Sequence, residues 1–288
     1  IIVVTGDIAF GGKKDEYALA KTLFVNLKSL LETELGKVVN IFISPGNHDC
    51  SLLPEDEIRT LTIDKVIESS GVDLKGSWIN KCTEAQQEYF SFESSLRGIE
   101  PVFSDVLWHE FELTVGGGVV RISALNAAWM SRLHEVQGQL VFPIDQYMEQ
   151  LEAPATLRLA LIHHPLNWYC QSSYHPLRKA LRTHCGAILS GHEHSVGSEV
   201  IQDSNGQAVL MLESPALQPH EEHLKPEFTC LLFDTDENSV IEKRYEATAD
   251  LPVQIGSEST HSIKLSGSNC RTNKIHPDFS KFLMDPGG

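Results

Sequence analysis

The sequence predicts an α/β fold, and three features at its beginning indicate it. Residues 1–5 form a continuous apolar run, typical of a strand that is covered on both faces. Residues 15–35 carry leucines at helical spacing and are followed by Gly36, a common helix stop. Residues 38–44 form a second, β-branched run. The order of strand, helix and strand predicts a right-handed parallel crossover.

The next part of the chain adds a helix and a hairpin. Residues 52–76 are polar and helix-leaning and carry no motif, and we expect this insertion to cover the site. Residues 83–96 have apolar periodicity that predicts a helix. Residues 108–115 and 119–125 flank three consecutive glycines, which predicts a β-hairpin.

Helices and strands then alternate before the pattern changes to strands alone. Residues 143–151 predict a short helix with Pro143 in its first turn. Residues 157–162 and 187–190 predict buried strands, and residues 176–183 predict a helix between them. From residue 195 onward the pattern predicts two hairpins, namely 196–201 with 208–212 and 228–233 with 240–245.

The size and charge of the chain limit what it can be. With 288 residues it can bury a substantial core. We expect residues 1–249 to form one domain and residues 250–288, which are polar and weakly periodic, to form a tail or a linker to a further domain. The formal net charge of −16 argues against a generally basic surface that tracks nucleic acid, although bound cations reverse the sign locally.

No window approaches the roughly 18 consecutive apolar residues that a membrane-spanning helix needs, so we expect no membrane partner. The 6 cysteines are scattered without a Cys-x-x-Cys pair. In a chain of this length that pattern favours free thiols in a reducing compartment, which predicts a cytoplasmic protein.

Four short polar segments follow apolar runs and carry ligand-type side chains. They are Gly6-Asp7, Gly46-Asn47-His48-Asp49, His163-His164-Pro165 and Gly191-His192-Glu193-His194. Aspartate oxygen, imidazole nitrogen and the amide oxygen of asparagine suit Mn, Fe or Zn. A carboxylate such as Asp7 has two oxygens and can bridge two ions. His192 and His194 would share a face in an extended segment, whereas a turn at Gly191 could aim them at two ions.

In this order, the four segments resemble the signature of the calcineurin-like metallophosphoesterase superfamily, over roughly residues 1–245. The resemblance implies a four-layer αββα sandwich with two mixed β-sheets. It also implies two divalent or trivalent metal ions at the C-terminal ends of the strands. The four-residue segment and the Gly-His-x-His segment are specific together, whereas Gly-Asp alone is a weak signal.

The resemblance also assigns the metal ligands. Asp7 would bridge the two ions. Asn47, His163 and His192 would complete one ion, and His194 would serve the other. The superfamily begins with a further motif, Asp-x-His, at the end of a strand that precedes the strand of residues 1–5, and this sequence contains neither. We expect the preceding strand and its motif to lie upstream of residue 1, and a site with a single metal is the alternative.

Within the same resemblance, His48 and Asp49 are the catalytic residues. His48 would stabilise charge on the phosphoryl group or protonate the leaving oxygen, while a metal-activated hydroxide attacks phosphorus. An imidazole suits this task because it titrates near neutrality. Asp49 would orient the ring of His48.

The resemblance narrows the function to one class of reaction, the hydrolysis of phosphoesters, and does not identify the substrate. We expect a phosphodiesterase, with a nuclease as one form of it, because a histidine acid suits a poor alkoxide leaving group. The substrate would be a phosphoester, including nucleotides or nucleic acid. A phosphomonoesterase or protein phosphatase is one alternative. A regulatory or scaffold module with a degenerate site, as part of a longer chain, is another.

Several residues near the motifs allow plainer interpretations. Residues 46–49 alone could be a turn cap, because glycine, asparagine and aspartate favour turns. His164 is expected to face the substrate or to be structural rather than to bind metal. Asn126 and Trp129 follow a predicted strand and could line the site, but packing explains Trp129 equally well. Cys50 is expected to be a small buried residue.

Overall fold

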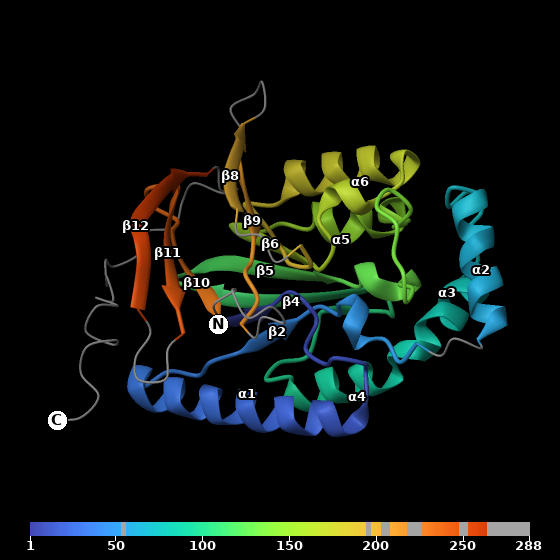
Figure 1. Ribbon diagram of the computed structural model, residues 1–288. Helices are drawn as coiled ribbons and strands as arrows, with labels where there is room; N and C mark the ends of the chain where they lie inside the picture. Colours follow the sequence, from blue (N-terminus) through green and yellow to red (C-terminus); the bar gives the residue numbers. More distant parts are fainter. Residues whose placement is uncertain (53–55, 194–196, 203–207, 218–225, 248–252, 264–288) are drawn as a thin grey trace.

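The computed structural model describes residues 1–52, 56–193, 197–202, 208–217, 226–247 and 253–263. These residues form two layers of β-sheet between two layers of helices (Figure 1). The predicted metal ligand His194 lies outside the described residues. None of the described helices combines the length and the apolarity that crossing a membrane requires.

The first helical layer covers a pair of parallel strands, as the beginning of the sequence predicts. Strand β1 (Ile2–Val4) pairs in parallel with β2 (Ile41–Ile43). The helix α1 (Lys14–Leu35) connects the two strands. The Glu16 carboxylate accepts the backbone N–H of Lys13 and so stabilises the start of α1. The helix ends at Gly36, whose φ of 60° is left-handed. Helix α4 (Gln87–Leu96) lies beside α1.

The second sheet has seven strands in a mixed arrangement, with parallel strands at its centre. In spatial order they are β3 (Phe103–Ser104), β4 (Trp108–Val115), β5 (Gly118–Leu125), β6 (Leu157–Ile162), β7 (Ala187–Ser190), β9 (Ala208–Glu213) and β8 (Gly197–Gln202). The pairs β5–β6, β6–β7 and β7–β9 are parallel. The pairs β4–β5 and β8–β9 are antiparallel, so the predicted hairpins at these positions are confirmed.

Alternation along β6 explains how this sheet separates two cores. Leu159 and Leu161 point into the space between the sheets, where they pack with Phe42 of β2. Ala160 and Ile162 point to the opposite face. That face is covered by α5 (Met148–Glu152) and α6 (Gln171–His184), with α2 (Glu57–Glu68) and α3 (Gly76–Thr83) at the edge of the molecule (Figure 1). The αββα sandwich is therefore confirmed.

A third, antiparallel sheet consists of β10 (Glu227–Asp234), β11 (Ser239–Glu246) and β12 (Val253–Ser262). Val240 of β11 reaches the core between the two-stranded sheet and the seven-stranded sheet. Strand β12 lies in the segment for which we expected a tail, and it pairs with β11. Most of its side chains are exposed, so its sequence lacks the apolar alternation that predicts a strand. The domain boundary after residue 249 stays a prediction.

Helix α6 and the insertion at residues 52–76 also differ from what the sequence predicts. Helix α6 begins at Gln171 rather than at residue 176, and Pro176 lies inside it. Proline is most common in a first helical turn, which is why the sequence predicts a later start. Within the insertion, α2 buries Ile63 and Val66 in the same core cluster as Trp129. At least this part of the insertion is therefore packed into the domain.

Candidate metal centre

Parallel strands from two different sheets carry the predicted ligands at their C-terminal ends. Asp7 follows β1, and Asn47 begins the short helix η1 (Asn47–Asp49) after β2. His163 follows β6 directly, and His192 follows β7 after Gly191. Four of the five predicted metal ligands thus lie within the described residues.

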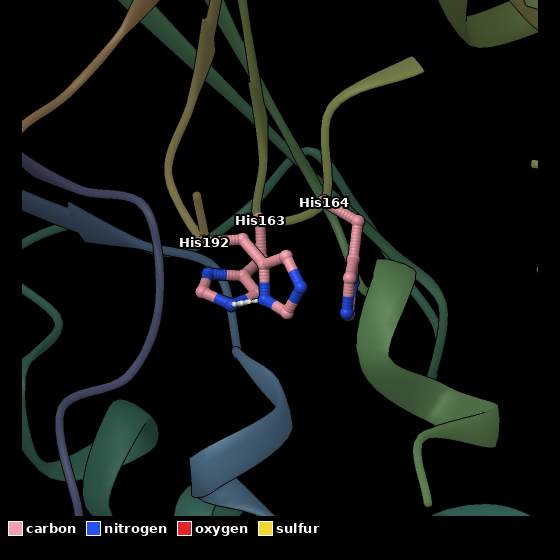
Figure 2. A group of neighbouring side chains, drawn as sticks. All are labelled: His163, His164 and His192. Atoms are coloured by element: carbon pink, nitrogen blue, oxygen red, sulfur yellow. Dashed lines mark hydrogen bonds between the residues drawn. The ribbon is translucent and has the colours of Figure 1, made fainter. Parts of the chain in front are cut away.

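The polar atoms of these four side chains converge on one point. The Nε2 atom of His163 lies 3.0 Å from the Asn47 Oδ1, 3.2 Å from the His192 Nδ1 and 3.3 Å from the Asp7 Oδ1. The His192 Nδ1 lies 3.1 Å from the Asn47 Oδ1. Figure 2 shows the rings of His163 and His192 against each other, with the ring of His164 to one side.

A backbone contact indicates which His163 nitrogen can bind a metal. Its Nδ1 lies 2.6 Å from the carbonyl oxygen of Thr5, which can only accept a hydrogen bond, so Nδ1 carries the proton. The Nε2 lone pair then faces the oxygens of Asp7 and Asn47, which are acceptors as well. A cation at this point would satisfy all of them, and carboxylate, amide and imidazole donors fit Mn, Fe or Zn.

The pKa values of the site residues are consistent with a positive charge at this point. Burial raises the pKa of Asp7, but the charge of His163 and its hydrogen bond outweigh burial and hold that pKa well below its usual range. Burial lowers the pKa of His163, but Asp7 outweighs it and the net direction is upward. For His192, burial and the neighbouring His164 and His163 lower the pKa to about 3, so its ring is neutral at pH 7 and can donate a lone pair.

The backbone of the site is unusual at its ligands and at two glycines. Asp7 and His192 have φ values of 56° and 73°, in the left-handed region that residues other than glycine seldom adopt. Gly6 and Gly46 pack beneath the His163 ring. A Cβ atom on Gly46 would lie 2.1 Å from the Asp7 Oδ1, and one on Gly6 would lie 2.5 Å from the His163 Nδ1. Both positions therefore require glycine.

His48 lies next to this point without entering the ligand set. Its backbone N–H donates to the Asp7 Oδ1 at 3.0 Å, which helps to fix the carboxylate. Its ring Nδ1 lies 2.8 Å from the carbonyl oxygen of Phe10, so the ring is held by a backbone acceptor. The Phe10 side chain is 67% exposed, and its ring centroid lies 5.5 Å from that of His48.

The Asp49 side chain lies among hydrogen-bond donors of the site, and its predicted role in orienting the ring of His48 stays a prediction. Its carboxylate is fully buried and accepts the N–H groups of Ile8, Ala9 and Gly46 and the hydroxyl of Tyr17. Burial raises the pKa of Asp49 to about 6, against the effect of these hydrogen bonds. Asp49 therefore joins the two loops that carry Asp7 and Asn47, and the Phe10 carbonyl oxygen contacts the Nδ1 of the His48 ring.

Glu135 is a site residue that sequence reasoning missed. It lies in the loop after η3 (Ala127–Met130), and its side chain is only 8% exposed. Its Oε2 lies 3.0 Å from the Nε2 of the fully buried His164 and 4.0 Å from the Nε2 of His192. No strand end or motif precedes Glu135, so the sequence around it contains no signal for this position.

Among the described residues, three histidines have possible ligand atoms within 4.8 Å of one another, which is close enough to hold a metal ion, namely His163, His164 and His192. The loop of His192 is held further by Glu193, whose Oε1 accepts the indole N–H of Trp168 at 2.7 Å. The Trp168 and His192 ring centroids are 4.3 Å apart. His192 is thus enclosed by groups from two loops.

The neighbouring residues with alternative interpretations are explained by packing. Trp129 is fully buried, and its Nε1 donates to the Val141 carbonyl at 2.8 Å. Asn126 is buried and exchanges hydrogen bonds with Gln86. Cys50 is 2% exposed, and the five cysteines of the described residues are free thiols.

Comparisons with known proteins agree with this arrangement. A family model described as calcineurin-like phosphoesterase matches residues 1–196. A search of curated proteins gave no match. Three solved structures that are similar to this chain have low sequence identity to it.

The first is a dimetal phosphatase from Danio rerio, at 13% identity, covering 91% of this chain and 83% of that chain, with a TM-score of 0.46. The second is vacuolar protein sorting 29 from Cryptosporidium parvum, at 14% identity, with coverages of 82% and 76% and a TM-score of 0.30. The third is a zinc complex of Vps29 from Entamoeba histolytica, at 9% identity, with coverages of 90% and 97% and a TM-score of 0.33.

The family match covers residues 1–196 of 288, which include every predicted ligand from Asp7 to His194. It agrees with the αββα layers and with side chains from four strand ends that converge on one point. The protein is therefore a metal-dependent phosphoester hydrolase and belongs to the calcineurin-like phosphoesterase family.

Proposed function

We propose that the protein is a phosphodiesterase whose metal ions are held by Asp7, Asn47, His163 and His192, with His194 as a further ligand. The observation that carries this proposal is the convergence of the first four side chains, which brings their ligand atoms within 3.3 Å of the His163 Nε2. When bound, the ions would supply Lewis-acid activation of water and neutralise phosphoryl charge.

The chain's own residues would orient this chemistry and move the proton. Asp7 is fixed by the His48 backbone N–H, and His163 by the Thr5 carbonyl, so both ligands are set before a substrate enters. The His48 ring contacts the Phe10 carbonyl through Nδ1, and its Nε2 would carry a proton to the leaving oxygen.

The surroundings of His48 favour a diester over a monoester. An alkoxide leaving group needs a proton because it is a strong base, and His48 can provide one. The largely exposed Phe10 ring lies beside His48, where it offers an apolar surface to an organic group on the leaving side. Such a surface suits the second ester arm of a diester.

The test compares bis-p-nitrophenyl phosphate with p-nitrophenyl phosphate on the Mn-loaded protein. A higher kcat/KM for the diester supports the proposal, and a higher value for the monoester supports the alternative of a phosphomonoesterase or protein phosphatase. Turnover of neither compound by the loaded protein would favour the regulatory module. Cyclic nucleotides and nucleic acid are the natural diesters to test next, and the cytoplasm is the compartment that we propose.

A further inference from the structure

We propose that Glu135 is a positioning residue of the metal centre: its carboxylate holds the Nε2 side of His192, so that His192 presents the lone pair of Nδ1 to the ion. This inference rests on the proposed metal-holding role of His192. It adds a residue that is not part of the family's four motifs.

Glu135 lies on the side of the His192 ring that faces away from Asn47. The two nitrogens of His192 face opposite ways, because Nδ1 lies 3.1 Å from the Asn47 Oδ1 while Nε2 lies 4.0 Å from the Glu135 Oε2. A histidine that binds metal through one nitrogen carries its proton on the other and donates it to an oxygen acceptor. Glu135 is the carboxylate on that side, and at 4.0 Å, which is longer than a hydrogen bond, it acts on the Nε2–H through its charge.

His164 links Glu135 to the rest of the centre. Its Nε2 lies 3.0 Å from the same Oε2, and its ring centroid lies 4.3 Å from that of His192. His164 is fully buried and adjacent to His163 in the chain, so its backbone is fixed by the end of β6. His164 therefore holds the carboxylate in place, which gives this residue the structural role that the sequence left open.

The charged groups around Glu135 explain why a carboxylate suits this position. Among the described residues, the ion-pair contacts of Glu135 are with His164 and His192, and no lysine or arginine takes part. A buried carboxylate needs hydrogen-bond donors or positive charge nearby, and here the histidines supply the contacts. A divalent ion on the other side of the His192 ring would add positive charge that favours the carboxylate further. The carboxylate would in turn make His192 a stronger donor.

The test uses Glu135→Gln, which keeps the shape of the side chain and removes its charge, and measures Zn and Mn binding by competition with a chromophoric chelator. We expect affinity to fall about 10- to 100-fold, the range found for partners behind metal-binding histidines. Glu100→Gln is the matched control, because the Glu100 side chain is 87% exposed and the variant removes the same charge far from the site. It should bind metal like the wild type.

Urea unfolding of both proteins with and without metal separates positioning from a merely structural role. Added metal should raise the free energy of unfolding of Glu135→Gln by less than it raises that of the wild type, because the variant binds the ion more weakly. In ¹⁵N-histidine spectra of the metal-free protein, the His192 proton should move from Nε2 toward Nδ1 in the variant. Unchanged metal affinity, or a metal-induced gain in stability equal to that of the wild type, would overturn the inference.

These measurements are independent of hydrolysis. If the wild type hydrolyses diesters but Glu135→Gln binds metal normally, the inference fails and the proposed function stands. If the wild type hydrolyses no phosphoester but the variant loses metal affinity as described, the inference stands and the proposed function fails.

Discussion

Asp7 and His192 occupy backbone conformations that cost energy, and both are proposed metal ligands. A left-handed conformation at a residue other than glycine costs on the order of 1–3 kcal/mol. The surrounding contacts maintain it: the His48 N–H and His163 hold the Asp7 carboxylate, while Trp168 packs against the His192 ring. The fold therefore fixes the ligand geometry before an ion arrives, which is the arrangement that tight metal binding needs.

The different roles of Asp7 and His48 can be separated by substitution. Asp7→Ala should lose both metal and activity, because it removes an oxygen at the point where the ligand atoms converge. His48→Ala should keep its metal and lose about 10²- to 10⁴-fold in kcat, the range for a general acid. Metal content by mass spectrometry, together with kcat for bis-p-nitrophenyl phosphate, checks both variants. Full activity in His48→Ala would remove this residue from the mechanism.

Gly46→Ala should abolish metal binding with a change of one methyl group. The added Cβ would lie 2.1 Å from the Asp7 Oδ1 and 2.8 Å from the His163 Cε1, so at least one ligand must move. Gly197→Ala is the control, because a Cβ there meets nothing within 4 Å. Isothermal titration with Zn should show strong binding to the control and none to Gly46→Ala. Equal affinity in both would contradict the tight packing of Gly46 against Asp7.

Cys50 should be chemically inert although it follows the motif directly. Burial raises the pKa of its thiol to about 12, so at pH 8 almost no thiolate is present. We expect Ellman's reagent to modify the partly exposed Cys170 in native protein and to leave Cys50 unmodified until unfolding. Peptide mapping after timed labelling identifies the cysteine. Rapid native labelling of Cys50 would show that this part of the chain opens readily.

At the level of the elements, the sequence predicts the strands that end at the site better than those at the periphery. Strands β6 and β7 have the predicted bounds, because each is an apolar run that stops at a polar motif. Strand β12 escapes prediction because its faces are largely exposed. Glu135 escapes it because its role depends on two histidines from other loops, which only tertiary structure brings to it. Local patterns thus predict ligands at strand ends and not the residues behind them.

An ion-pair cluster joins α4 to β4 and should make stability depend on pH. Burial raises the pKa of Glu93, but hydrogen bonds from His109 and Arg97 outweigh it, so the pKa is lowered. A group with a lowered folded-state pKa stabilises the fold above its unfolded pKa, about 4.3 for glutamate, and loses that contribution as pH falls below it. Glu93→Gln should therefore be less stable than wild type at pH 7, and the difference should shrink below about pH 4.

Urea unfolding of both proteins at pH 7 and below pH 4 measures this difference. His109 contacts the same carboxylate, so the comparison with His109→Asn at the same two pH values separates its contribution. A difference between wild type and Glu93→Gln that grows as pH falls would contradict the cause that we assign to the pKa of Glu93.

At the level of the whole molecule, the site connects the two sheets. Asp7 and Asn47 follow strands of the small parallel sheet, and His163 and His192 follow strands of the seven-stranded sheet. The Thr5 carbonyl and the His163 Nδ1 add a hydrogen bond across the same boundary. An ion bound here would hold both layers of the sandwich together.

Metal should therefore stabilise the whole fold and not only a loop. At a free metal concentration 100 times the Kd, binding adds about 2.7 kcal/mol to the free energy of unfolding. We expect Mn or Zn to raise the Tm and a chelator to lower it again. Calorimetry of wild type and Asp7→Ala with and without metal checks this, because the variant should show no shift. A metal-induced rise in Asp7→Ala equal to that of wild type would mean that the ion binds elsewhere.

The hydrogen bond from His163 to Thr5 crosses between the two sheets. Movements of one sheet relative to the other would therefore change the geometry of the proposed metal site. A ligand field changes when a donor moves by a fraction of an ångström, and here the donors belong to separate sheets. Cobalt(II) in place of the natural ion would give visible absorption bands that report any sliding of one sheet over the other. Mutations deep in the core between the sheets, such as at Phe42 or Leu161, could then be followed as a change of colour at the centre.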